Sequence, residues 1–311
     1  MYVCFRPQGE VDISHWIPEL RSALGTDHRL AIWPECEDPD KVDGLISWRL
    51  IGGDDTTFPN LKFFHSLSAG MDHVINHPAR RHDLRLIRMV EPGMRKAMAE
   101  YVTAYVMRLH RNMDNNDIYL GKSKWGMYVP ALAQDRRIGI LGFGELGRAC
   151  AKTLYQLGFD VAVWGRSKRG VDYAVSYAGE ADFTPFLNRS DILVNLLPLT
   201  HETENILDSS LFEKLPDGAG LINVARGQHL VDDDLLAALD RGKLSRAVLD
   251  VFRQEPLAKD HPFWDHARII MTAHVAAQTI PKTGAQAVAD NLAMIGRGQS
   301  PAAEIDPARG Y

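Results

Sequence analysis

Short apolar runs alternate with helix-like patterns along almost the whole chain, and this alternation restricts its fold more than any other feature. A strand, a helix and a second strand in succession form a crossover unit, so the pattern predicts parallel sheets covered by helices. Two series of strands are expected, at 2–6, 29–33, 44–48, 61–67 and 84–89, and then at 136–141, 160–164, 191–197, 219–224, 246–251 and 268–272.

The chain is long enough for two domains, since it has 311 residues. A helical stripe at 98–109 follows the break at Pro92-Gly93 and separates the two series of strands. We therefore expect an α/β protein of two doubly wound, Rossmann-like domains. One domain is predicted at residues 1–99 plus 276–311, to which the closing helix returns, and the other at 100–275.

The charge balance gives no broad attraction to nucleic acid or to anionic membranes, because the net charge is -5 and the isoelectric point is near 6.2. Three scattered cysteines without C-x-x-C spacing indicate a reducing compartment, with no disulfide framework and no metal site. The first residues lack a secretory signal pattern, and no apolar run is long enough to span a bilayer. The expected protein is cytoplasmic and binds neither nucleic acid nor membrane.

A glycine-rich turn follows the strand at 136–141 and opens a helical stretch. Gly142, Gly144 and Gly147 match G-x-G-x-x-G, which in this position is typical of dinucleotide binding. The glycines permit a tight turn and a close approach of pyrophosphate, while the first helical turn, with Glu145 and Leu146, offers N–H groups to the phosphates. The alternative is a glycine-rich turn in an unrelated α/β protein.

The next strand ends in cations where NAD-binding proteins normally carry an acid. Arg166, Ser167 and Lys168 follow Gly165, whereas the nearest acid, Asp160, lies at the other end of the strand. Guanidinium and ammonium groups bind a 2′-phosphate, which a carboxylate would repel. The turn therefore predicts NADPH, with NADH possible as a weaker cofactor. The alternative is a solvated basic loop.

Three later strands end in residues suited to the reduction of a ketone. Arg226, Glu255 and His274 each follow a buried strand, so they are expected at one edge of the sheet. Arginine can clamp a carboxylate, and histidine can donate the proton that the new alkoxide needs. A carboxylate beside the ring favours its charged form. Asp250, five residues before Glu255, is left as either a site residue or a turn cap.

These residues carry a resemblance that covers essentially the whole chain. The run LINVARGQHLVDDDLLAALDRGKLSRAVLDVFRQEPL, the glycine loop and MTAHVAAQT resemble the D-isomer-specific 2-hydroxyacid dehydrogenase family. SLSAGMDHV, NLLPLTHET and the terminal ARGY are similar to its glyoxylate/hydroxypyruvate reductase A group. The resemblance implies a flavodoxin-like substrate domain, a dinucleotide-binding domain and an active site in the cleft between them. It also implies NADPH-dependent reduction of glyoxylate and hydroxypyruvate to glycolate and D-glycerate.

The resemblance also implies roles for single residues. Arg226 would bind the 2-oxo acid, His274 would be the acid/base and proton donor, and Glu255 would orient it. Asp250 would support the nicotinamide, and the backbone of Ala69 and Gly70 would hold the substrate carboxylate. The cofactor would be lined by Leu197, Pro198, Thr203, Val224 and Ala225.

Two tryptophans and one substitution leave alternatives open. Trp48 is predicted either as a wall of the substrate pocket or as a core residue. The resemblance implies a homodimer, in which Trp125 either reaches the neighbouring active site or anchors the interface. Ala273 stands where the family usually has proline, which reduces the rigidity of the loop before His274.

Two other functions remain open at this point. The same fold serves cofactor-sensing regulators that are not enzymes, and the catalytic trio alone does not exclude that role. A methyltransferase is a weaker alternative, since it leaves the basic turn and the trio unexplained. Within the reductases, spacing does not separate glyoxylate from a bulkier 2-oxo acid.

Overall fold

The computed structural model describes residues 1–7, 13–78, 80–114 and 129–307. Trp125 and the terminal ARGY therefore lie outside the described residues. The chain divides into two compact units, formed by residues 1–94 with 278–311 and by residues 95–277. The first division falls near the start of helix α4 (Pro92–His110) rather than at residue 99.

The first unit is built on a five-stranded parallel sheet in the order β2-β1-β3-β4-β5. This order is that of flavodoxin-like folds, in which ligands bind at the carboxyl ends of the strands. Its elements are β1 (Tyr2–Phe5), α1 (Trp16–Leu24), β2 (Arg29–Ile32), η1 (Pro39–Lys41), β3 (Gly44–Ser47), α2 (Asp54–Thr57), β4 (Phe63–Ser66), α3 (Asp72–Ile75), β5 (Arg85–Ile87) and α10 (Pro281–Gly296).

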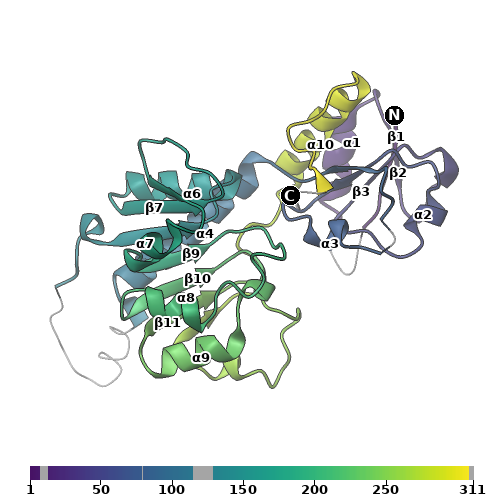
Figure 1. Cartoon of the computed structure of the whole chain (residues 1–311). Coiled ribbons are helices and arrows are strands. Elements are labelled where there is room, and N and C mark those ends of the chain that lie inside the picture. The colour runs from purple at the N-terminus through teal and green to yellow at the C-terminus, as the bar shows by residue number, and fades with distance from the viewer. Residues whose placement is uncertain (8–12, 79, 115–128, 308–311) are drawn as a thin grey trace. The chain divides into compact units, whose positions relative to one another are not determined.

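Both faces of this sheet are buried. Helices α1 and α10 pack side by side in the first unit (Figure 1). The Nδ2 of Asn291 on α10 lies 3.0 Å from Nε2 of His65 on β4, which ties this helix to the sheet. Alternate residues of the strands, such as Cys4, Leu45 and Phe64, belong to one cluster of buried side chains.

The second unit is built on a seven-stranded parallel sheet in the order β12-β11-β10-β9-β6-β7-β8. Its order reverses between β6 and β9, where a doubly wound sheet binds its ligand. Its elements, after α4, are η2 (Ala133–Asp135), β6 (Arg137–Leu141), α6 (Glu145–Gln156), β7 (Asp160–Gly165), β8 (Val175–Ala178), α7 (Phe183–Asn188), β9 (Ile192–Asn195), α8 (Ser209–Lys214), β10 (Ala219–Asn223), η3 (Gly227–His229), α9 (Asp232–Asp240), β11 (Leu244–Leu249), η4 (Pro262–Trp264) and β12 (Ile269–Met271).

Helices cover both faces of this sheet, as the continuous apolar strands require. One cluster of buried side chains joins the strands to α4 and α6, with Val102, Val106 and Leu154 among its members. A second cluster joins the strands to α7, α8 and α9, with Phe186 and Phe212 among its members. Figure 1 shows these helices on both sides of the strands. The predicted α/β fold of two parallel, doubly wound sheets is confirmed.

Strand β8 was not predicted from the sequence. It lies at the edge of the second sheet, pairs only with β7, and its four residues are exposed or half-buried. An edge strand needs no continuous apolar run, so the signal that marked the other strands is absent from VSYA.

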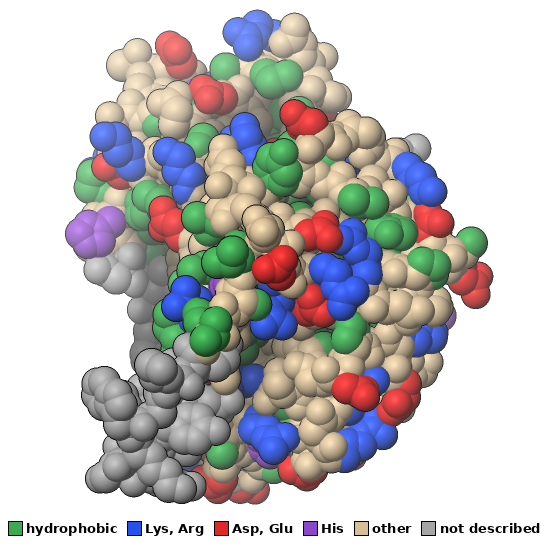
Figure 2. Space-filling view, turned by 90° about the vertical axis from the view of Figure 1, so that its left-hand side faces the viewer, with side chains coloured by type: hydrophobic (Ala, Val, Ile, Leu, Met, Phe, Trp, Pro, Cys, Tyr) green, Lys and Arg blue, Asp and Glu red, His purple; other side chains and the backbone are tan. Residues whose placement is uncertain are grey.

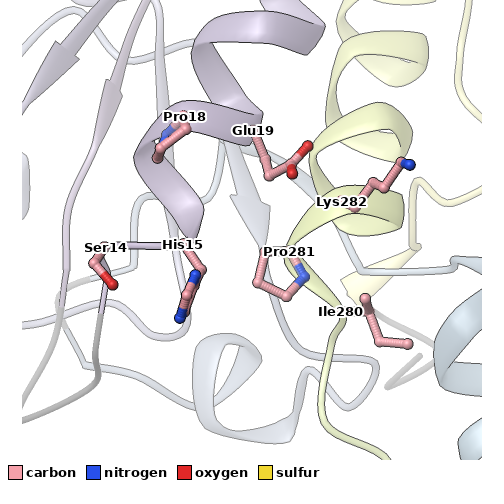
Figure 3. A pocket seen from close by; sticks show the side chains of 7 residues that line it. All are labelled: Ser14, His15, Pro18, Glu19, Ile280, Pro281 and Lys282. Atoms are coloured by element: carbon pink, nitrogen blue, oxygen red, sulfur yellow. The ribbon is translucent and has the colours of Figure 1, made fainter.

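One face of the molecule is of mixed character. On the face shown in Figure 2, basic and acidic side chains lie next to one another, with hydrophobic side chains scattered between them. Within the described part of the chain, no helix has the length and apolar character needed to cross a membrane. In the first unit a pocket of about 350 Å³ lies between the first turns of α1 and α10 (Figure 3), lined by Ser14, His15, Pro18, Glu19, Ile280, Pro281 and Lys282. No residue predicted for the site lines this pocket.

Candidate active site

The glycine loop connects β6 to α6 with the geometry expected of a phosphate-binding turn. Gly142 has φ 97°, which L side chains rarely adopt, and a Cβ at Gly147 would lie 2.0 Å from the carbonyl oxygen of Gly142. Both glycines are therefore required by the protein itself. At Gly144 a Cβ would meet no described atom within 4 Å. Gly144 thus leaves open space beside the N-terminus of α6, where the backbone N–H groups and the helix dipole favour an anion.

The predicted cations lie at the surface where β7 ends. Arg166, Ser167 and Lys168 are exposed. Asp160 begins β7 at the opposite end of the strand and pairs there with Arg189. The end of β7 next to the glycine loop therefore presents basic side chains, as the sequence predicts.

One of these cations has an acidic neighbour that sequence analysis did not identify. The Nζ of Lys168 lies 2.9 Å from Oδ2 of Asp182. The same carboxylate oxygen accepts the N–H of Ala178 at 3.0 Å. The hydrogen bond from Lys168, together with that N–H, lowers the pKa of Asp182 from its ordinary value. The charge of Lys168 is thus shared between solvent and the carboxylate of Asp182, which follows β8 in the chain.

Arg226 is placed by a close contact between two turns. It follows β10 and its Nη1 donates to the carbonyl oxygen of Ala225 at 2.9 Å. The next residue is Gly227, where a Cβ would lie 1.8 Å from the carbonyl carbon of Phe252. Only glycine lets the turn after β10 pack against the turn after β11, so Gly227 brings Arg226 next to the segment that carries Glu255.

Glu255 and His274 form a hydrogen-bonded pair. The Nδ1 of His274 lies 2.8 Å from Oε2 of Glu255, and the Phe252 N–H donates to Oε1 of Glu255 at 2.9 Å. The side chains of His274 and Glu255 are 48% and 36% exposed, so solvent or a small ligand can reach them. Burial opposes the ionisation of Glu255, but the hydrogen bonds from His274 and Phe252 and the charges of His274 and Arg226 outweigh it and lower the pKa of Glu255.

The turn that carries His274 is held by Asp250. His274 has φ 54°, a left-handed conformation that costs energy in a residue other than glycine. Its N–H donates to the carbonyl oxygen of Asp250 at 2.8 Å. The buried Asp250 carboxylate accepts the N–H groups of Val275 at 2.8 Å and Ala276 at 3.0 Å. The structure therefore shows that Asp250 caps this turn, and its support of the nicotinamide stays a prediction.

Two hydroxyl groups extend this network to α4. The Thr272 Oγ1 donates to Oδ1 of Asp250 at 2.5 Å. Because a hydroxyl has only one hydrogen, Thr272 accepts the hydrogen of the Tyr101 hydroxyl, 2.5 Å away. Burial raises the pKa of Tyr101, so its hydroxyl keeps that hydrogen. Tyr101 and Thr272 were not identified in the sequence, because a hydroxyl on a helix and one at a strand end have no common spacing.

The remaining residues predicted for the cofactor lie around the glycine loop and the strand ends. Glu145 opens α6 and pairs with Arg95 of α4 at 2.8 Å. Thr203 donates to the carbonyl oxygen of Pro198 at 2.7 Å, which closes the turn after β9. Three other residues predicted to line the cofactor are almost fully buried at the carboxyl edge of the sheet: Leu197, Val224 and Ala225.

The predicted substrate residues of the first unit lie at the carboxyl ends of its strands. Trp48 follows β3 and packs edge-on against Trp16, with the ring centroids 5.6 Å apart, while it remains half-buried. It is therefore both a packing residue and a partly accessible surface. Ala69 and Gly70 lie in the turn after β4 and are half-buried.

The chain matches a known family and several solved structures. The model of the D-isomer specific 2-hydroxyacid dehydrogenase NAD-binding domain matches residues 103–276. A D-isomer specific 2-hydroxyacid dehydrogenase from Xanthobacter autotrophicus Py2, in complex with NADPH and MES, is 32% identical over 99% of both chains, with a TM-score of 0.93. An NADPH-dependent glyoxylate/hydroxypyruvate reductase from Sinorhizobium meliloti, in complex with NADP and sulfate, is 30% identical over 100% of this chain and 99% of that one, with a TM-score of 0.93.

A third solved structure agrees with these two. A probable 2-hydroxyacid dehydrogenase from Rhizobium etli, in complex with NADP, HEPES and tartaric acid, is 28% identical over 100% of this chain and 99% of that one, with a TM-score of 0.89. The family model covers more than half of the chain and includes the glycine loop, Arg226, Glu255 and His274. The chain belongs to the D-isomer specific 2-hydroxyacid dehydrogenase family.

Proposed function

We propose that this protein reduces small 2-oxo acids, glyoxylate and hydroxypyruvate among them, to the 2-hydroxy acids glycolate and D-glycerate with NADPH. The observation that carries the proposal is the His274–Glu255 hydrogen bond, which lies beside the charge of Arg226 at the carboxyl edge of the sheet. The similarity to a glyoxylate/hydroxypyruvate reductase supports this choice of substrates.

The residues present fit a dinucleotide with a 2′-phosphate. Gly144 leaves open space at the start of α6, and Leu146 belongs to the same helical turn, whose N–H groups suit the pyrophosphate. Arg166, Ser167 and Lys168 are exposed where the adenosine ribose of such a cofactor would lie, and they suit a phosphate rather than a bare hydroxyl. When bound, NADPH supplies the hydride that the carbonyl carbon accepts. Three similar proteins were crystallised with NADPH or NADP.

The proton chemistry falls to His274 and its neighbours. Reduction leaves a negative charge on the substrate oxygen, and this oxygen must take up one proton. The Nδ1 of His274 is held by Glu255, so Nε2 is the atom that gives the proton. The ionised carboxylate of Glu255 stabilises the imidazolium before the transfer, and solvent returns the proton afterwards. For the reverse reaction, neutral His274 takes the proton from the alcohol.

Arg226 and Asp250 set the geometry in which this transfer occurs. The planar guanidinium of Arg226 binds the 2-oxo acid through parallel hydrogen bonds, which orient the carbonyl group and stabilise its developing charge. Asp250 is a positioning residue, because its carboxylate holds the left-handed turn of His274. The roles of Trp48, Ala69 and Gly70, the lining by Leu197, Pro198, Thr203, Val224 and Ala225, and the homodimer remain predictions.

A panel of 2-oxo acids tests the proposal. Glyoxylate, hydroxypyruvate, pyruvate and a bulkier branched 2-oxo acid are mixed with the protein and either NADPH or NADH, and loss of the reduced cofactor is followed. We expect the highest kcat/KM with NADPH and one of the two small acids, and His274→Ala should remove most of it. If no acid is reduced faster by the wild type than by His274→Ala, the protein is not this reductase. Fastest turnover of the branched acid would instead replace the substrate class.

A further inference from the structure

Three polar side chains are fully buried behind the turns of the candidate site. Asn195 and Asn223 end the adjacent strands β9 and β10 and are paired in register. His229 ends the short helix η3 that follows Arg226. All three have no exposed surface. Buried polar groups cost stability unless they are hydrogen-bonded. The hydrogen bonds of Asn195, Asn223 and His229 therefore indicate the role of this cluster.

The backbone determines how the two amides are oriented. The N–H of Leu197 donates to Oδ1 of Asn195 at 3.2 Å, and the N–H of Ala225 donates to Oδ1 of Asn223 at 3.3 Å. Because an N–H needs an acceptor, neither amide can be turned over. The Nδ2 of Asn195 therefore donates to Oδ1 of Asn223 at 3.1 Å.

The amide of Asn195 in turn determines the state of His229. Its Nδ2 also lies 3.0 Å from Nδ1 of His229, so this ring nitrogen accepts a hydrogen and carries none. The Nε2 of His229 lies 3.3 Å from the carbonyl oxygen of Pro198, which can only accept. Both contacts are satisfied at once by a neutral ring with its proton on Nε2.

The cluster connects two turns that the proposed function uses. The Nδ2 of Asn223 donates to the carbonyl oxygen of Arg226 at 3.0 Å, and the N–H of His229 donates to the same oxygen at 3.3 Å. On the other side, Asn195 and His229 hold Leu197 and Pro198. The backbone of Arg226 is thus joined, through three buried side chains, to the Leu197–Pro198 turn.

We propose that His229, as a neutral ring protonated on Nε2, is a positioning residue that sets the turn of Arg226 and the Leu197–Pro198 turn relative to each other. Through the first turn it orients the guanidinium that binds the 2-oxo acid, and through the second it shapes the wall of the nicotinamide site. This inference rests on the proposed function, because it assigns to His229 a role in that same site. Neither turn can shift alone while the ring bridges them.

Two substitutions each remove one of the two ring contacts described for His229 and keep the other. In His229→Asn the amide oxygen reaches the position of Nδ1 and keeps the acceptor for Asn195, but the donor to Pro198 is lost. In His229→Gln the amide nitrogen reaches the position of Nε2 and keeps that donor, but the acceptor for Asn195 is lost. We expect His229→Asn to raise the Kd for NADPH, measured by fluorescence titration, by about tenfold, which is the effect of one hydrogen bond. We expect His229→Gln to raise the KM for glyoxylate by about tenfold for the same reason.

A buried histidine near the amino ends of the strands of the same sheet supplies the control. His110 is 3% exposed and packs edge-on against Phe159 just before β7, with ring centroids 5.1 Å apart. His110→Asn should lower the melting temperature and leave the Kd for NADPH and the KM for glyoxylate unchanged. If the His229 variants behave in this same way, losing stability alone, the ring is only structural and the positioning role is refuted.

A measurement on the wild type covers the case in which the variants do not fold. Histidine ¹⁵N NMR identifies which ring nitrogen carries the proton. We expect the Nε2–H form for His229 at neutral pH, and the Nδ1–H form or a doubly protonated ring would overturn the proposal. Failure of the wild type to reduce any 2-oxo acid would refute the proposed function instead, while NADPH titration and the NMR measurement would still test the position of the ring.

Discussion

Glu255 holds the Nδ1 of His274 through one carboxylate oxygen, at 2.8 Å, while the other oxygen accepts a backbone N–H from the turn after β11. The carboxylate is therefore fixed before the imidazole approaches it. Because the pKa of Glu255 is lowered, this group is ionised throughout the neutral range.

Glu255→Gln should restrict reduction to lower pH. The amide keeps the shape but removes the negative charge that stabilises the imidazolium, so the alkaline limb of kcat/KM for glyoxylate should move toward lower pH. The measurement is kcat/KM against pH with saturating NADPH. Glu213→Gln, which removes a carboxylate from a surface pair with Arg241, is the control. An alkaline limb in the same place for wild type and Glu255→Gln would exclude this coupling.

Thr272→Val should slow turnover with little effect on cofactor binding. The change removes the donor to Asp250 and the acceptor for Tyr101 while keeping the side-chain shape, so the left-handed turn of His274 becomes less well ordered. A loss of about tenfold in kcat corresponds to one such hydrogen bond. Thr153→Val, whose hydroxyl donates within α6 at 3.0 Å, should leave kcat unchanged. Equal kcat in both variants would show that Thr272 does not act through His274.

Arg226→Lys should raise the KM for 2-oxo acids and lower kcat, while NADPH binds nearly as before. Lysine keeps the charge but loses the planar fork that orients the carbonyl group. Steady-state kinetics with glyoxylate, together with fluorescence titration of NADPH, separate the two effects. A variant with the kcat/KM of the wild type would assign Arg226 a structural role only.

Arg166→Asp combined with Lys168→Ala should weaken NADPH far more than NADH. The double change removes two cations that attract a 2′-phosphate. It also adds one anion and leaves Asp182 without the lysine that it pairs with, and both carboxylates repel the phosphate. Each lost charged hydrogen bond should cost about 1.5–3 kcal/mol of binding. Kd values for both cofactors give the test, with Lys152→Ala on α6 as a control for a lost surface charge. Equal losses for NADPH and NADH would contradict the phosphate assignment.

His65 should make the first unit less stable in mild acid. Burial is the main cause that lowers the pKa of His65 from 6.5 to about 4, so between these values the unfolded chain takes up a proton that the folded one does not. Stability is then lost as pH falls through this window, by at most about 3 kcal/mol. Urea unfolding at about pH 7 and about pH 4.5, near the two ends of this pH window, measures the loss of stability. His65→Gln, which keeps an acceptor for Asn291, should lose less stability over the same interval; an identical loss would remove His65 as the cause.

The sequence allowed the doubly wound sheet around the glycine loop and the Glu255–His274 pairing to be predicted, because both follow from local rules. A glycine loop after a strand starts a doubly wound sheet, and residues that follow neighbouring parallel strands meet at one edge. The network of Asn195, Asn223 and His229 could not be predicted in this way. Its members become neighbours only through the register of β9 against β10, which residue spacing along the chain does not contain.

Asp182 and strand β8 were missed for a related reason. The strand is short, half-buried and at the edge of the sheet, so it carries no apolar run. Because β8 was not predicted, the carboxylate of Asp182 could not be placed beside Lys168 from the sequence. Asp250 could be described as a turn cap, but the donors on its carboxylate became clear only from the left-handed backbone of His274.

The return of the chain to the first unit has a consequence for biosynthesis. Residues 95–277 form one continuous segment, whereas the first unit needs α10, which begins at Pro281 and packs on α1. Domains usually fold as they leave the ribosome, the N-terminal one first. Here the cofactor unit is synthesised in full before the helix that covers α1 exists. The unit whose translation begins first is therefore the unit that completes its fold last.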